Sequence, residues 1–316
     1  MTISIHKPEI KIICGPTASG KTGLAFSLAG QKSSSLISAD SRQIYRGLDI
    51  VTGKDIPSGF EKKISTLTFN HRPVIYYEKD NLRLWGLDLL EVDEVYNAAD
   101  FSILSKQIIQ AEIQSGRQVF VVGGTGFYLK ALVHPETLAS AVPDEELRAQ
   151  LNNLSAEELA QKLWELTPQR FVSMNQSDAS NPRRLVRAIE VAESTFSKPT
   201  TDGEVGESVS YTWIGLNPTL DELKDRITTR VQIRLKNGAV TEVRNLLESF
   251  PDQNLPVYTT LGVKPLVKFI QGEIDEATLI TLWVTDELNY AKRQITWFKK
   301  QPEIVWYDLD KVSIPK

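Results

Sequence analysis

The segment that most constrains this chain is residues 15–22, which read Gly-Pro-Thr-Ala-Ser-Gly-Lys-Thr and match the pattern of a P-loop. A short β-branched run precedes this segment and a helical pattern follows it, as a P-loop requires. Glycines in such a loop let backbone N–H groups turn toward phosphate oxygens, and the helix N-terminus adds its dipole. The sequence therefore predicts a diphosphate-binding loop formed by Gly15, Pro16, Thr17, Ala18, Ser19, Gly20, Lys21 and Thr22.

Two side chains of this loop bear on the chemistry. Lys21 offers a positive charge to the phosphates, and the Thr22 hydroxyl is a candidate ligand for Mg²⁺. The alternative is a glycine-rich turn that contains Lys-Thr by accident, and the flanking strand and helix patterns argue against it. We therefore expect a ligand that carries a diphosphate.

A strand-end carboxylate is the second candidate group. A common P-loop nucleotidase carries a Walker-B aspartate, but here the apolar run at residues 119–122 ends in Gly123 and Gly124. Asp40 ends another apolar run and lies directly beside the P-loop if the strands follow the usual order. A carboxylate there can bind metal or accept a proton, and a strand-end aspartate can also simply cap the next turn. The residues alone leave these roles open.

The pattern of strands and helices predicts an α/β fold. Strand runs at residues 10–14, 35–39 and 118–122 are separated by helical patterns, one of them at residues 98–114, which favours a parallel sheet flanked by helices, as in P-loop NTPases. Residues 74–78 and 82–88 are separated by Lys-Asp-Asn and predict an antiparallel hairpin.

In the second half of the chain, most residue patterns are typical of helices. Capping boxes at Ser155 and Thr219 and an Asn181-Pro182 start predict helices, and residues 275–300 predict a long helix that is broken or kinked. Residues 197–210 are polar and predict a mobile linker, after which residues 211–216 rejoin the sheet. We therefore expect a P-loop core from residues 1–134 and 211–316 and a helical insertion domain at residues 135–210.

Composition limits the class of protein. The chain has 316 residues, a net charge of −4 and one cysteine, so a disulfide scaffold and a protein that coats nucleic acid are disfavoured. It shows no apolar run long enough for a membrane span and no export signal, so we expect a cytoplasmic protein without a membrane partner.

Four ordered blocks carry a resemblance to a known family. They read GPTASGKT at residues 15–22, ISADSRQIYRG at 37–47, VGGTGFYL at 122–129 and YAKRQITWF at 290–298, and weaker likeness extends over most of the chain. In these blocks the chain resembles tRNA dimethylallyltransferases. The resemblance implies transfer of a dimethylallyl group from its diphosphate to N6 of the adenosine next to the anticodon, with Mg²⁺ as cofactor and the tRNA anticodon stem-loop as partner.

The resemblance also implies roles for individual residues. Asp40 would be the general base, Thr17 and Thr125 would line the channel where the two substrates meet, and Arg230 would contact the diphosphate. The tRNA would be contacted by Asp40, Ser41, Arg42 and Gln43, and by the basic side chains Arg183, Arg184 and Arg187. As an alternative to tRNA binding, these arginines simply form a helix face exposed to solvent.

Departures from the family pattern concern residues 84–88 and 262–265, where the chain reads Leu-Trp-Gly-Leu-Asp and Gly-Val-Lys-Pro, and the position of Arg234, where a methionine is common. Three other functions stay open: an adenylate isopentenyltransferase that uses free AMP, ADP or ATP, a P-loop small-molecule kinase and an inactive RNA-binding relative. We expect a monomer.

Overall fold

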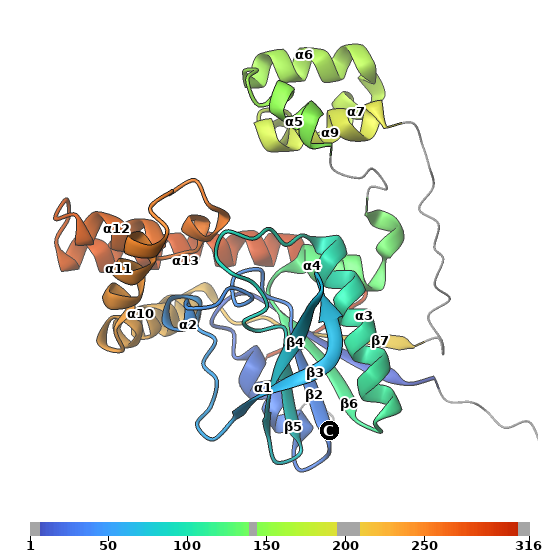
Figure 1. Cartoon of the computed structure of the whole chain (residues 1–316), viewed down its shortest axis with the longest axis vertical. Coiled ribbons are helices and arrows are strands. Elements are labelled where there is room, and N and C mark those ends of the chain that lie inside the picture. Colours follow the sequence, from blue (N-terminus) through green and yellow to red (C-terminus); the bar gives the residue numbers. More distant parts are fainter. Residues whose placement is uncertain (1–6, 139–143, 195–208, 309–316) are drawn as a thin grey trace, which may run out of the picture. The chain divides into compact units, whose positions relative to one another are not determined.

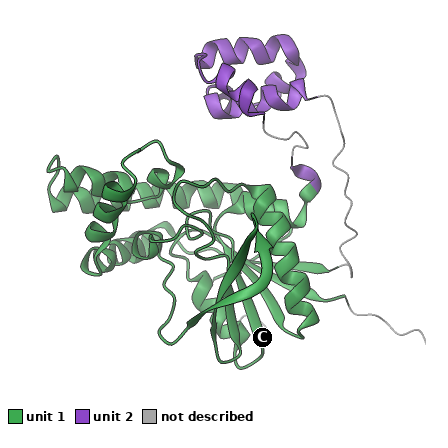
Figure 2. Ribbon diagram, viewed as in Figure 1, with its two compact units in different colours: residues 1–135, 205–316 green, residues 136–204 purple. Residues whose placement is uncertain are grey.

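The computed structural model describes residues 7–138, 144–194 and 209–308. The chain divides into two compact units, residues 1–135 with 205–316 and residues 136–204 (Figure 2). The predicted linker at residues 197–210 lies outside the described residues except for its last two positions.

The first unit is built on an eight-stranded sheet with the order β3-β4-β5-β2-β6-β1-β7-β8 (Figure 1). In this order, all neighbouring strands from β5 through β2, β6, β1 and β7 to β8 pair in parallel. The β3–β4 and β4–β5 pairs are antiparallel. The strands are β1 Glu9–Cys14, β2 Ser34–Ser38, β3 Glu61–Phe69, β4 Arg72–Lys79, β5 Leu82–Trp85, β6 Gln118–Gly123, β7 Ser210–Leu216 and β8 Ile304–Tyr307. The predicted α/β fold with a largely parallel sheet is confirmed.

Helices cover both faces of this sheet because its central strands are apolar on both sides. On one face, Leu36 and Phe120 pack with Ala25 of α1 (Lys21–Ala29). On the other face, the Ser35 hydroxyl donates to Glu112 of α3 (Ala98–Gln114). The remaining α-helices of this unit are α2 Asp49–Thr52, α4 Gly126–Val133, α10 Leu220–Lys236, α11 Ala239–Ser249, α12 Val263–Ile270 and α13 Glu276–Phe298. Short 3-10 turns lie at Pro135–Thr137 and Pro256–Thr259. The last two residues of the first turn belong to the second unit.

Two expectations need correction. The helix expected to break within residues 275–300 is continuous over Glu276–Phe298, because it contains no Gly or Pro and buries one face at helical spacing. The predicted hairpin is present as β4 and β5, but the edge strand β3 was missed. Its alternating exposed and half-buried residues carry too few apolar side chains to predict a strand.

The second unit is a small helical body with a core of its own. Its helices are α5 Glu145–Leu151, α6 Ala156–Leu166, α7 Pro168–Val172, α8 Gln176–Ala179 and α9 Pro182–Glu193. The predicted caps are present, because Ser155 forms a capping box with Glu158, and the Asn181 side chain accepts from the Arg184 amide. Leucines of α6 pack against α9, so the unit buries an apolar centre independently of the sheet.

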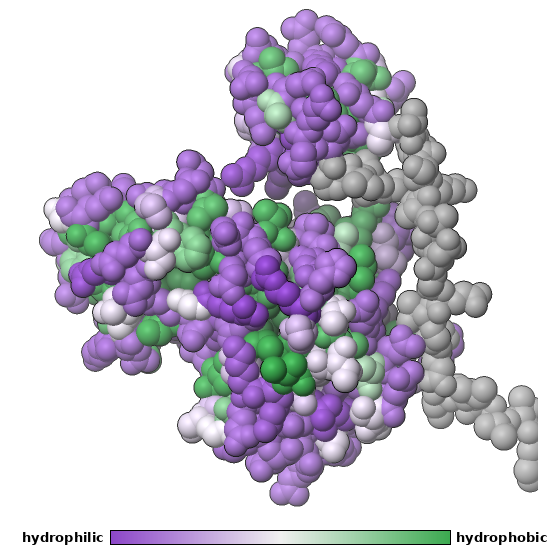
Figure 3. Space-filling model, in the orientation of Figure 1, coloured by the Kyte–Doolittle hydropathy of each residue, from purple (hydrophilic) through white to green (hydrophobic). Residues whose placement is uncertain are grey.

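One face of the molecule is mostly polar. Hydrophilic residues dominate the face in Figure 3, with hydrophobic residues in small groups between them. Among the described residues, the search for membrane-spanning helices finds none that is long and apolar enough to cross a bilayer.

Candidate active site

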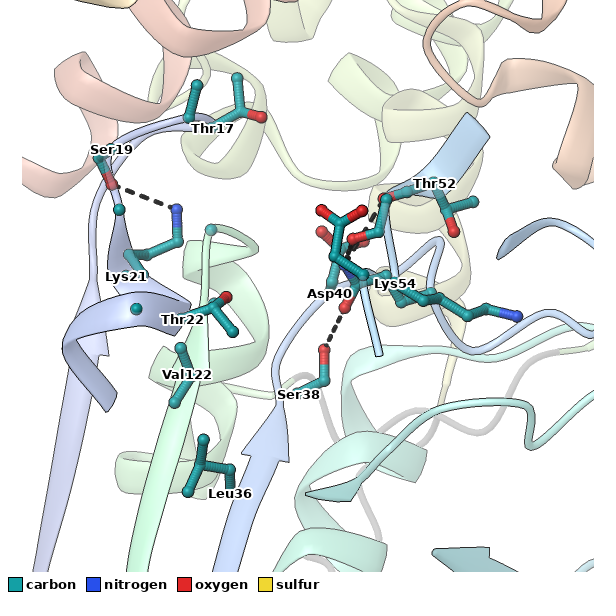
Figure 4. Close-up of a pocket in the computed structure, with 18 of the residues that line it drawn as sticks. Thr17, Ser19, Lys21, Thr22, Leu36, Ser38, Asp40, Thr52, Lys54 and Val122 are labelled. Carbon is teal, nitrogen blue, oxygen red and sulfur yellow. Dashed lines mark hydrogen bonds between the residues drawn. The ribbon is translucent and has the colours of Figure 1, made fainter. Parts of the chain in front are cut away.

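The P-loop adopts the backbone conformations that its sequence predicts. Gly20 has φ 91° and Ala18 has φ 59°, so the chain turns tightly between β1 and α1. The Lys21 Nζ donates to the carbonyl oxygen of Pro16 at 2.6 Å and to the Ser19 hydroxyl at 3.4 Å (Figure 4). Burial and, to a smaller extent, the nearby Arg230 guanidinium together lower the pKa of Lys21 to about 8. The Lys21 side chain thus folds back so that its ammonium contacts the loop, where its positive charge favours an anionic ligand.

A pocket of about 400 Å³ opens in front of the P-loop. All eight P-loop residues except Gly15 and Pro16 line it, and so do the ends of β2 and β6 and one face each of α10 and α13. The pocket therefore brings Lys21 and Thr22 together with Asp40 and Arg230, three chain segments that are distant in sequence. Gly15 lies just outside this lining and packs against the backbone of Leu216.

Asp40 reaches this pocket across a strand. We expected Asp40 to lie directly beside the P-loop, and this expectation is wrong. Asp40 follows β2 and the P-loop follows β1, and strand β6 lies between these two strands in the sheet. Figure 4 nevertheless shows the Asp40 and Lys21 side chains facing the same space. The Asp40 Oδ1 accepts the Arg42 amide at 2.8 Å, and the Thr125 hydroxyl accepts the Ser41 amide at 3.2 Å. The first contact caps the turn after β2 and leaves Oδ2 of Asp40 for other partners.

Arg230 connects α10 to the P-loop. Its Nη2 donates to the Thr17 hydroxyl at 2.6 Å, which places a guanidinium beside the P-loop. The Thr17 amide donates to Gln294 Oε1 at 2.8 Å, and Gln294 Nε2 donates to the Gly124 carbonyl at 2.9 Å. One buried glutamine of α13 therefore holds the P-loop and the turn after β6 in a fixed relation.

Sequence reasoning missed Gln294, and also Glu287 and Tyr290, as members of the site. Glu287 and Gln294 are polar residues at buried positions of α13, and that departure from an apolar helix face is the signal that marks them. Tyr290 and Asp40 also line a second cavity of about 270 Å³ next to the first, with Arg42 and Arg230. Burial and, to a smaller extent, the charge of Asp40 together raise the pKa of Tyr290 to about 12.

The segment after β2 is tied into the fold. Gln43 accepts the Ser38 hydroxyl at 2.8 Å and donates to the Gly53 carbonyl at 2.8 Å, while Arg42 donates to the Pro256 carbonyl at 3.1 Å. Ser41 contributes to the second cavity. Residues 41–43 therefore form one wall of the space that Asp40 faces.

The three candidate arginines of α9 belong to the second unit, whereas the P-loop belongs to the first. Arg184 forms an ion pair with Asp178, and Arg187 lies 3.1 Å from Glu190. Arg183 is exposed. Local carboxylates thus compensate part of the charge of this cluster.

One departure from the family pattern is explained by an ion pair. Asp88 contacts the buried ammonium of Lys54, which also reaches Asp49 at 2.5 Å. Tyr77 donates to the other oxygen of Asp88. Trp85 stacks on Tyr76 with ring centroids 4.5 Å apart. Leu84, Trp85 and Leu87 of this segment line the pocket, so the segment forms part of its packed wall.

The donor set of the pocket fits Mg²⁺. Among the described residues, no group of three or more His, Cys, Asp or Glu could enclose a metal. Mg²⁺ ordinarily keeps several waters and takes only one or two protein ligands besides substrate phosphates. The Thr22 hydroxyl and the Asp40 carboxylate supply hard oxygen atoms in the pocket, so the residues present suit an ion held mainly by a diphosphate.

Two family models match the chain, one described as IPP transferase over residues 76–301 and one as isopentenyl transferase over residues 8–73. The chain is 32% identical over 310 residues to a tRNA dimethylallyltransferase from Alkaliphilus oremlandii, with 96% of this chain and 92% of that protein covered. A tRNA dimethylallyltransferase from Maridesulfovibrio salexigens is 34% identical over 307 residues, with 96% and 93% covered.

Solved structures agree with these matches. A full-length tRNA isopentenylpyrophosphate transferase from Bacillus halodurans is 29% identical, with a TM-score of 0.65 over 96% of this chain and 90% of that one. A eukaryotic dimethylallyltransferase acting on tRNA shares the fold, with a TM-score of 0.76 at 21% identity over 95% of this chain and 74% of that one. Since one family model covers most of the chain and relatives above 30% identity align along nearly all of it, the chain belongs to the tRNA dimethylallyltransferase family.

Proposed function

We propose that the protein transfers a dimethylallyl group from dimethylallyl diphosphate to N6 of the adenosine next to the anticodon in tRNA. The observation that carries the proposal is the single pocket in which Lys21 of the P-loop, Arg230 and Asp40 meet. Two cations and a loop of backbone N–H groups suit a diphosphate, and the carboxylate faces the space that remains for the acceptor.

The donor would be held by its diphosphate. Backbone N–H groups of residues 15–22 and the charge of Lys21 would bind the phosphate oxygens, and Arg230 would approach them from α10. The apolar side chains of Phe26 and Leu36 line the same pocket and offer a surface to the hydrocarbon part of the donor. Mg²⁺, held by Thr22 and the diphosphate, would neutralise negative charge on the phosphates.

The reaction follows from this arrangement. As the adenine N6 forms a bond to C1 of the dimethylallyl group, the bond from C1 to the diphosphate oxygen breaks, and the electron pair leaves with the diphosphate. Asp40 would accept the proton that N6 loses, since the neutral amine is a weak nucleophile. Lys21 and Arg230 would stabilise the charge on the departing diphosphate. Thr17 and Thr125 would line the channel between the substrates.

The acceptor must leave its stack in the anticodon loop to reach this pocket. Extruding a base costs a few kcal/mol, which contacts to the RNA must offset. Ser41, Arg42 and Gln43 would contact the extruded adenosine, because Ser41 and Arg42 line the second cavity with Asp40 and Gln43 lines the first pocket with Asp40. The helical unit at residues 136–204 would contact the stem-loop through the arginines of α9.

The decisive experiment offers the protein two acceptors. A tRNA anticodon stem-loop and AMP are incubated together with dimethylallyl diphosphate and Mg²⁺, and the nucleosides are analysed by mass spectrometry. We expect prenylated adenosine in the stem-loop. Preferential prenylation of AMP would instead favour the adenylate isopentenyltransferase alternative, and release of phosphate from ATP without prenyl transfer would favour a kinase.

We also propose that the protein acts as a monomer in the cytoplasm, where tRNA is the acceptor. Light scattering coupled to size-exclusion chromatography tests the first part, with about 35.5 kDa expected for one chain.

A further inference from the structure

A buried carboxylate of α13 lies between two guanidinium groups, and the reaction as proposed does not use it. Glu287 is 1% exposed. One of its oxygens accepts from Arg230 Nη2, and the other accepts from Arg234 Nη1 at 2.8 Å and from Trp283 Nε1 at 3.1 Å. Since a buried charge is costly unless it is paired and hydrogen-bonded, this fully partnered carboxylate is a specific feature of the site.

Helical spacing brings the group together. Arg230 and Arg234 are four residues apart on α10, and Trp283 and Glu287 are four residues apart on α13, so each pair lies on one face of its helix. The two helices pack against each other. The carboxylate therefore sits where the inner faces of α10 and α13 meet, and it lines the second cavity.

Glu287 determines where the Arg230 guanidinium points. The Nη2 atom that contacts Glu287 also donates to the Thr17 hydroxyl of the P-loop at 2.6 Å. Arg230 is thus held between a fixed buried anion on one side and the phosphate-binding loop on the other. An arginine side chain without such a tether would lose this direction, because it has several freely rotating bonds.

Arg234 adds a second cation to the same anion. Its side chain is buried and lines both cavities of the site. A Cβ atom at Gly53 would overlap Arg234 Nη2, so this glycine leaves the space that the guanidinium occupies. Burial lowers the pKa of Arg234, and the neighbouring Arg230 lowers it further. With one carboxylate and two guanidiniums, the cluster formed by Arg230, Arg234 and Glu287 carries a net charge of +1.

We propose that Glu287 is a positioning residue that holds Arg230 toward the diphosphate of the donor, and that Arg234 sets the net positive charge that this diphosphate meets. The inference rests on the proposed function, because it assigns the diphosphate to the pocket of Lys21 and Arg230. Two properties of the site are separate. The net charge of the cluster governs the affinity for diphosphate, and the Glu287 carboxylate governs the orientation of the Arg230 guanidinium during transfer.

The two properties predict an order of affinities. Glu287→Gln raises the cluster charge to +2, Arg234→Met lowers it to zero, and the double variant returns it to +1. One unit charge near a diphosphate changes its affinity by about tenfold or more at the effective dielectric constant of a protein interior. Diphosphate should therefore bind most tightly to Glu287→Gln, equally to wild type and the double variant, and most weakly to Arg234→Met.

The test measures binding of inorganic diphosphate by calorimetry in the presence of Mg²⁺, with all variants checked for a cooperative thermal transition. Asp286→Asn is the matched control, because it removes an exposed carboxylate from the next position of the same helix and should leave the Kd unchanged. If Glu287→Gln does not fold, wild type, Arg234→Met and the double variant still test the order. Any other order, including weaker binding by Glu287→Gln, overturns the proposal.

Transfer activity supplies the second readout. Glu287→Gln should lower kcat by about tenfold or more while the KM for dimethylallyl diphosphate stays equal or falls, because binding gains charge while Arg230 loses its direction. A merely structural residue would raise KM and lower kcat together, and that result also overturns the proposal. If wild type transfers no dimethylallyl group to tRNA, the proposed function fails, and the diphosphate titration still decides the charge order separately.

Discussion

Replacing Lys21 with Met should make the protein more stable and less able to bind diphosphate. Burial lowers the pKa of Lys21 from 10.5 to about 8. One pKa unit corresponds to about 1.4 kcal/mol, so at about pH 7 the folded protein holds this ammonium at a cost of about 3 kcal/mol relative to the unfolded chain. Met keeps the length of the side chain but loses the hydrogen bond to Pro16, which is worth about 1 kcal/mol. We expect a net gain of about 1–3 kcal/mol in the free energy of unfolding.

The pH dependence identifies the cause. The pKa of Lys21 is lower in the folded than in the unfolded protein, so the cost is fully present below pH 8 and disappears as the pH rises toward 10.5. Urea unfolding at about pH 7 and at about pH 10 should therefore show a gain that shrinks at the higher pH. Added inorganic diphosphate with Mg²⁺ should stabilise wild type and leave the variant almost unchanged. A variant that is less stable at about pH 7, or a gain independent of pH, would refute this reasoning.

Other substitutions test the remaining parts of the site. Asp40→Asn keeps the shape of the side chain but removes the proton acceptor, so single-turnover transfer should slow by about 10²–10⁴ with tRNA affinity near normal; an equal loss of affinity would argue against a general base. Neutralising Arg183, Arg184 and Arg187 together should raise the KM for tRNA and reduce its salt dependence, with the KM for the donor unchanged. Gly126→Ala places a Cβ atom against a tryptophan ring of α13 and should lower the free energy of unfolding by about 1–3 kcal/mol, measured in urea.

The features that the sequence predicted best are local. The P-loop is a contiguous segment whose glycines set its backbone conformation, and Lys21 and Thr22 line one pocket in the structure. The caps at Ser155, Asn181 and Thr219 join residues three positions apart. Such features can be predicted because the interacting groups are neighbours in the chain.

The features that escaped prediction depend on context. The edge strand β3 (Glu61–Phe69) is half-buried and polar, so its state is decided by pairing with β4 and not by its own composition. The unbroken α13 buries Glu287 and Gln294 on a face that an apolar pattern would leave to core side chains. The contacts of Glu287 with α10 and of Gln294 with the P-loop depend on how these segments pack against α13 in the folded chain.

The sequence by itself determined the P-loop turn between β1 and α1, the α/β class and the list of candidate residues. Tertiary structure decided which of them meet: Arg230 contacts Thr17 from 213 positions away, and Gln294 contacts the Thr17 amide from 277 positions away. It also decided the charge balance around Glu287 and the lowered pKa of Lys21, since both arise from burial. The physical reason is that hydrogen bonding and desolvation depend on distance in space, which helix packing and strand order set and which no local pattern encodes.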